Sequence, residues 1–172
     1  MEQIPFNVVQ NSIDLICGIT EEKDLEKASE HFFDAQPELT SFFMEFIQDM
    51  SEGAQDLGFM MALILNKAFE DHYVTLRILT EDEIVEKFEK SESDFERYLN
   101  MTDELIEELQ KAASAKGQPE ILNYIIEELF MSPDLEPELE MNEQIHLFII
   151  CKFFVDCLND LAIQTGPAQL KH

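Results

Sequence analysis

Residues 145–163 read IHLFIICKFFVDCLNDLAI, the most apolar stretch of the chain. A helix with this composition has apolar side chains on nearly every side, which is typical of a helix buried within a fold. We therefore predict a helix over about 143–164, at the centre of the molecule, and expect Thr165-Gly166-Pro167 to end it. After His146 its polar side chains are confined to Lys152, Asp156, Asn159 and Asp160.

A second apolar helix is predicted over about 54–79. Ala54, Gly58 and Ala62 follow one another at intervals of four, so three small residues share one face of it. Such a ridge lets another helix approach closely, and Gly58, which lowers helix propensity by about 1 kcal/mol relative to alanine, indicates a packing requirement there. No stretch alternates as a strand does. The chain is predicted to be all-α, a single-domain bundle of about seven helices with these two apolar helices at its centre.

Local signals place the ends of other helices. Thr80 and Glu83 have the spacing of a capping box, in which each side chain bonds to the other residue's backbone. Pro37 and Pro119 each stand where a helix can begin without losing a hydrogen bond. These signals predict helices that start at about residues 37, 81 and 119.

Two segments fall outside the predicted helices of the single domain 1–172. Residues 132–143 are dense in acids and contain two prolines, which predicts an acidic loop. Residues 165–172 are predicted to form a C-terminal tail.

The charge of the chain constrains its partners. Thirty-seven acidic and eleven basic residues give a net charge of −26, of which 80–143 contribute −15 and 144–172 nothing. Nucleic acids and anionic membranes would be repelled, because binding them requires clustered Lys and Arg. A basic protein or peptide, or a cation, would be attracted.

Nothing in the sequence predicts export or membrane insertion. The first five residues lack the basic start of a signal peptide. The longest uninterrupted apolar stretch, 59–65, is too short to cross a bilayer. Cys17, Cys151 and Cys157 have no paired spacing, so we expect reduced thiols. A soluble, cytoplasmic protein is therefore predicted.

The sequence contains no complete catalytic motif. A nucleophile elbow, a glycine-rich phosphate loop and a calcium-binding loop are all missing. We therefore predict no catalytic residues and no cofactor.

One pattern favours a divalent metal. Glu143 and His146 are three residues apart and share a face of the last predicted helix, as in the Glu-x-x-His pairs of di-iron bundles. A metal site would form if His31 and Glu70 met this pair. The alternative hypothesis is therefore a metal-binding bundle or metal-dependent enzyme. In the simpler interpretation, Glu143 only stabilises a helix N-terminus.

The acidic loop favours protein–protein interaction. Acids alternate there with apolar residues, as in acidic interaction segments. We predict a non-enzymatic adaptor, regulator or dedicated chaperone that meets a basic partner through this loop and residues 81–110. The predicted contact residues of the loop are Asp134, Leu135, Glu136, Glu138, Leu139 and Glu140.

Two further possibilities stay open. A nucleic-acid mimic would order its carboxylates along one face at the spacing of phosphates. A homodimer would need an apolar patch, such as one containing Phe42, Phe46 or Phe95, to offset the repulsion between two acidic copies.

Overall fold

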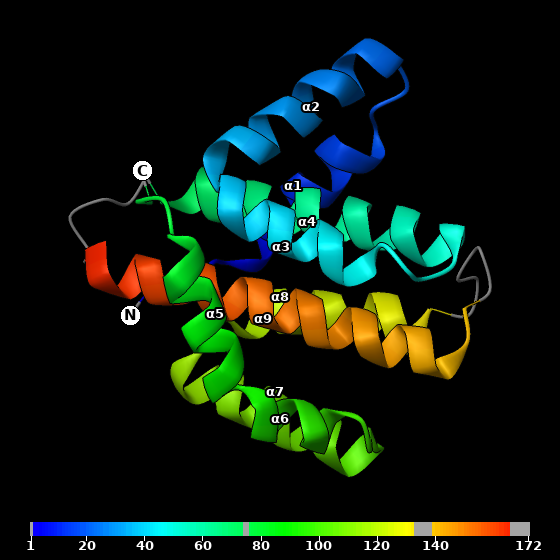
Figure 1. Ribbon diagram of the computed structural model, residues 1–172, viewed down its shortest axis with the longest axis vertical. Helices are drawn as coiled ribbons and strands as arrows, with labels where there is room; N and C mark the ends of the chain where they lie inside the picture. Colours follow the sequence, from blue (N-terminus) through cyan, green and yellow to red (C-terminus); the bar gives the residue numbers. More distant parts are fainter. Residues whose placement is uncertain (1, 74–75, 133–138, 166–172) are drawn as a thin grey trace.

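The computed structural model describes residues 2–73, 76–132 and 139–165, and within them the chain is entirely helical apart from turns and short connections (Figure 1). This confirms the all-α prediction. The helix count exceeds the predicted seven in part because the segment 81–99 divides at Ser91 into two helices. The described elements are α1 (Phe6–Cys17), α2 (Glu22–Ala35), α3 (Pro37–Ile47), α4 (Glu52–His72), α5 (Glu81–Lys90), α6 (Glu92–Tyr98), α7 (Asp103–Lys116), α8 (Pro119–Ile126), a π-helical turn (Glu127–Met131) and α9 (Met141–Thr165).

The two apolar helices lie side by side at the centre, as predicted (Figure 1). Ala54 and Ala62 of α4 are fully buried. A Cβ atom built on Gly58 would lie 2.9 Å from Leu147 Cδ2 of α9, so the glycine leaves the space that this leucine occupies. The small-residue ridge thus sets the close approach of α9 to α4.

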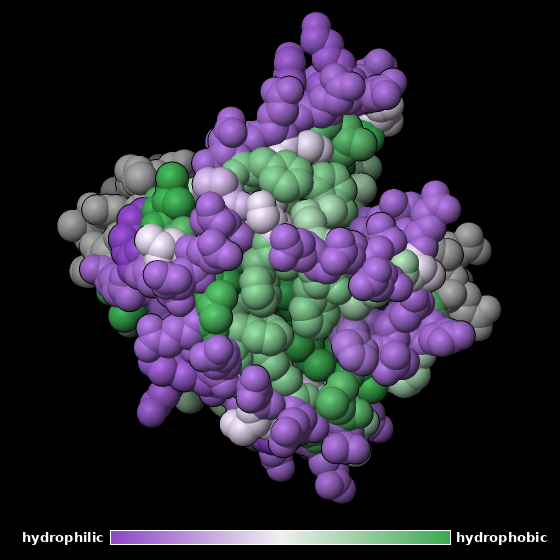
Figure 2. Space-filling view, in the orientation of Figure 1, coloured by the Kyte–Doolittle hydropathy of each residue, from purple (hydrophilic) through white to green (hydrophobic). Residues whose placement is uncertain are grey.

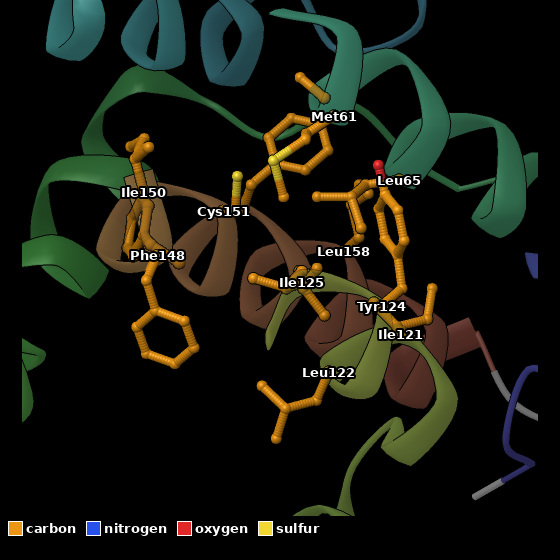
Figure 3. Close-up of a cluster of buried hydrophobic side chains, with 14 of the residues drawn as sticks. Met61, Leu65, Ile121, Leu122, Tyr124, Ile125, Phe148, Ile150, Cys151 and Leu158 are labelled. Atoms are coloured by element: carbon orange, nitrogen blue, oxygen red, sulfur yellow. The ribbon is translucent and has the colours of Figure 1, made fainter. Parts of the chain in front are cut away.

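The core between α4, α8 and α9 is filled by aliphatic side chains, aromatic rings such as those of Tyr124 and Phe148, and a thiol (Figure 3). Full burial of a Leu, Ile or Met side chain contributes about 1.5–3 kcal/mol, so this layer supplies much of the driving force for folding. Side chains in it with at most 1% of their surface exposed include Met61, Leu65, Ile121, Ile125, Cys151 and Leu158.

Helix α4 ends at His72, seven residues before the predicted end at Leu79. Tyr73 is extended, and the buried side chain of Gln36 binds the segment that follows. Its Nε2 donates to the Arg77 carbonyl at 2.8 Å, and the Leu79 amide donates to its Oε1 at 3.0 Å. Gln36 therefore supplies hydrogen-bond partners for two backbone groups of residues 76–79, which are not helical.

Several predicted helix ends are confirmed. Thr80 and Glu83 form a capping box at the start of α5, and Pro37 and Pro119 are the first residues of α3 and α8. Of the predicted acidic loop, 133–138 lie outside the described residues, as do 166–172 of the predicted tail. Among the helices described, none combines the length and the apolar character needed to cross a membrane.

Candidate functional site

Four half-buried phenylalanine rings gather on one side of the bundle, and we call Phe42, Phe46, Phe88 and Phe95 the aromatic face. They come from α3, α5 and α6. The Phe88 ring centre lies 5.1 Å from that of Phe42 and 4.9 Å from that of Phe95. Beneath them the buried ring of Phe153, on α9, lies 5.3–6.1 Å from three of the four. Mutual packing at tilted and edge-on angles therefore holds each ring in place.

The outer side of the aromatic face is open to solvent. Figure 2 shows an apolar area over α3, α5 and α9, bordered by hydrophilic side chains. Val85, one turn before Phe88 on α5, is 42% exposed and extends the apolar surface along that helix. A contiguous apolar area on a highly charged surface is typical of a contact site.

Helices α5 to α7 carry twelve acidic and five basic residues. Three of the bases already form ion pairs: Lys87 with Asp160, Lys90 with Glu86 and Arg97 with Glu108. Nine exposed carboxylates on these helices form no ion pair within the described ranges, which leaves a negative potential that attracts cationic groups. They are Glu81, Asp82, Glu89, Glu92, Asp94, Glu96, Asp103, Glu104 and Glu107.

An ion pair fixes the start of α5. The two terminal guanidinium nitrogens of Arg77 donate to the Glu83 carboxylate, Nη2 at 2.7 Å and Nη1 at 3.0 Å, and Nη2 also donates to Gln164 Oε1 of α9. These hydrogen bonds from Arg77, with those from Thr80, lower the pKa of Glu83 to about 2. Glu83 therefore stays ionised at neutral pH and ties the acidic helices to the end of α9.

The predicted interaction loop is described only at its end. Asp134, Leu135, Glu136 and Glu138 lie outside the described residues. Of the two that remain, Leu139 is buried in the core and Glu140 is exposed. Leu139 therefore anchors the start of α9, and only Glu140 is available to a partner.

The carboxylate of Glu143 binds the N-terminus of α4. Its two oxygens accept hydrogen bonds from the Ser51 amide at 2.9 Å and from the Ser51 hydroxyl at 3.0 Å, while Ser51 itself caps the Ala54 amide. His146 is occupied within its own helix, where Nδ1 donates to the Asn142 carbonyl at 2.7 Å. Glu143 thus acts at a helix N-terminus, but at that of a different helix.

The other two predicted metal ligands meet each other. His31 Nε2, on α2, lies 2.9 Å from Glu70 Oε2, close enough to donate a hydrogen bond to the carboxylate. Glu70 lies at the opposite end of α4 from Ser51, where Glu143 binds. At about 1.5 Å of rise per residue, the helix separates the two positions by roughly 28 Å.

The prediction of one metal site from Glu143, His146, His31 and Glu70 is therefore corrected. Their spacing along the chain does not reveal that the length of α4 separates the two pairs. Within the part of the chain that the structure describes, no group of three or more His, Cys, Asp or Glu side chains could share a metal ion.

Replacing Glu143 by alanine is expected to lower the free energy of unfolding by about 1 kcal/mol, because it removes the acceptor of the Ser51 amide and hydroxyl at the start of α4. Urea denaturation measures the change. The control is Glu30→Ala, the same truncation at an exposed position of α2. Loss of a stoichiometric bound metal from the Glu143→Ala variant, with unchanged stability, would contradict the capping role.

The buried thiols do not support nucleophilic chemistry. Burial raises the pKa of Cys151 and of Cys157, so both stay protonated at neutral pH. Cys17 is the exposed cysteine. Partial burial of its thiol, and to a smaller extent the negative charges of Glu128 and Asp14, raise its pKa as well.

From the sequence, Phe42, Phe46 and Phe95 were predicted only as a possible dimer patch. Contact between these residues and Phe88 was not predicted. Their helical spacing shows that each has an apolar neighbour on its own helix, but not which rings from different helices meet. Comparison of the chain with protein-family models, curated proteins and solved structures gave no match.

Proposed function

We propose that this protein is a non-enzymatic interaction protein that receives a basic amphipathic helix of a partner on the aromatic face. The observation that carries the proposal is the combination of four half-buried rings with nine unpaired carboxylates on the neighbouring helices. Apolar side chains of the incoming helix would lie on the rings, and its Lys and Arg side chains would meet the acids.

The physical contributions of the two parts differ. A few well-buried residues, often aromatic, supply most of the affinity in protein interfaces, and truncating any one of them costs more than about 1 kcal/mol. Charge complementarity mainly raises the association rate and selects the partner. An amphipathic helix satisfies both, because its apolar residues at intervals of three and four form one stripe with charged residues on either side.

A labelled synthetic helix with a leucine stripe and lysines elsewhere tests the proposal by fluorescence anisotropy. Phe46→Ala is expected to weaken binding about tenfold, because loss of one ring of the aromatic face costs roughly 1.4 kcal/mol. Phe46 packs only at the edge of the ring cluster, 6.4 Å from Phe88 and 6.5 Å from His146, so the fold should tolerate the change. The matched control is Phe33→Ala, which truncates a ring of α2 that is 38% exposed.

Raising the salt from about 0.1 to 0.5 M is expected to weaken binding, because the Debye length shortens from about 10 Å to less than half that value. Equal affinity for a scrambled peptide of the same composition would contradict the docking of an amphipathic helix on the aromatic face. A stable homodimer in sedimentation velocity, lost in the Phe46→Ala variant, would contradict the choice of partner, because a second copy would then occupy the face.

A further inference from the structure

Helix α2 stands away from the rest of the bundle (Figure 1). Of its fourteen residues only Phe32, near the C-terminal end, is buried. The N-terminal half of the helix therefore overhangs α1 and α4, and a cleft lies beneath it.

The cleft contains two cavities that share His31, Asn66, Lys67 and Glu70. The first has a volume of about 400 Å³, and we call it the apolar cavity because its walls are mostly aliphatic and aromatic. The second, of about 460 Å³, continues past the His31–Glu70 hydrogen bond towards Tyr73. Both volumes are in the range of sites for small molecules. Besides the four shared residues and the exposed Asp24 and Lys27, the apolar cavity is walled by Leu15, Ile16, Ile19, Ala28, Phe32 and Leu63.

The charged groups at the boundary of the two cavities already have partners. His31 is hydrogen-bonded to Glu70, and Lys67 Nζ donates to Asp71 Oδ1 at 2.7 Å. A charged ligand would have to displace one of these pairs and leave water for apolar walls, which is unfavourable.

Asn66 differs from these paired groups. Only 5% of its surface is exposed, it lines both cavities, and its side-chain amide has no hydrogen-bond partner among the residues that the structure describes. Its amide atoms are not sealed from solvent, because among the described residues the fully buried side-chain atom without a partner is His72 Nε2. The Asn66 amide therefore opens to the cavities, where water or a ligand can bond to it. A ligand in the cleft that both donates and accepts a hydrogen bond would satisfy it.

We propose that the cleft beneath α2 binds a neutral amphiphilic small molecule. The apolar body of the molecule fills the apolar cavity, and an amide or hydroxyl head group exchanges hydrogen bonds with Asn66. The apolar walls account for the apolar body, and the Asn66 amide accounts for the polar head. Neutrality follows because the charged groups at the boundary are paired, while Asp24 and Lys27, the other charged residues of the apolar cavity, are opposite in sign and exposed to water. This site is separate from the aromatic face and does not depend on the proposed partner helix.

A fluorescence titration with N-phenyl-1-naphthylamine, a neutral probe whose emission rises in apolar surroundings, tests the cavity. One-to-one saturable binding is expected. Ala28→Phe, which places a ring in the cavity, should weaken it at least tenfold. Glu26→Phe adds the same ring at an exposed position of α2, and should leave the affinity within twofold. Circular dichroism and a cooperative thermal transition verify that each variant is folded.

Competition against the bound probe tests Asn66. Octanamide should displace the probe at a concentration roughly threefold to tenfold lower than N,N-dimethyloctanamide, because the dimethyl compound has no N–H to donate. In Asn66→Leu this preference should disappear, whatever the affinity for the apolar body becomes.

Three results would overturn the proposal. The first is absence of saturable probe binding, which would mean that the cleft holds only water. The second is probe binding that Ala28→Phe leaves unchanged, which would place the probe elsewhere, for example on the aromatic face. The third is an amide preference that persists in Asn66→Leu.

Discussion

Replacing Phe154 by alanine is expected to lower the free energy of unfolding by about 3–5 kcal/mol. Its ring is fully buried on α9 and lies 5.7 Å from the ring of Phe43 and 6.0 Å from that of Phe32. Truncation therefore opens a cavity where three helices meet. Since domains of this size are stable by about 5–15 kcal/mol in all, the loss would be a large fraction of the total.

Urea denaturation followed by far-UV circular dichroism measures this change. The control is Phe6→Ala, because the Phe6 ring is 62% exposed at the start of α1 and its loss should change the stability by no more than about 0.5 kcal/mol. Similar losses for the two variants would show that α9 is not at the centre of the core.

Replacing Gln118 by leucine is expected to lower the free energy of unfolding by about 2–4 kcal/mol, because leucine keeps the approximate size but removes every hydrogen bond of the side chain. Gln118 is 4% exposed. Its Oε1 accepts from the Ile4 amide at 2.7 Å, and its Nε2 donates to Asn159 Oδ1 at 2.9 Å. The variant would leave the Ile4 amide buried without an acceptor and Asn159 without its donor.

Two measurements separate this effect from a general loss of packing. Hydrogen exchange at the Ile4 amide should accelerate more than exchange at the centre of α4. Gln48→Leu, the same substitution at an exposed position just after α3, should change the stability by less than about 0.5 kcal/mol. A loss no larger than that of Gln48→Leu would contradict the role assigned to Gln118.

The burial of Phe154 can be predicted from the sequence, whereas that of Gln118 cannot. Phe154 lies in the stretch 145–163, whose composition alone predicts a buried helix. Nothing near Gln118 in the sequence distinguishes it from the exposed glutamines, because Ile4 and Asn159 are 114 and 41 residues away. Its importance arises from where α8 meets the N-terminal segment and α9.

The candidate sites show the same division. The i, i+3 spacing of Glu143 and His146 fixes the helix face that they share, but Ser51, the residue that Glu143 binds, comes from another helix end. Asn66 was not distinguished from its neighbours on the helix predicted over 54–79. Only the overhang of α2 creates the cavities that the Asn66 amide lines.

The sequence by itself determined the all-helical class, the two central helices, the small-residue ridge at Gly58 and the concentration of acids outside the core. Each of these is a periodicity or a composition within one segment, and burial follows from it directly. The tertiary structure alone decided where α4 ends, which rings form the aromatic face and which polar groups find partners. These depend on the relative placement of helices, because a hydrogen bond or ring contact requires two side chains within a few ångströms, whatever their separation along the chain.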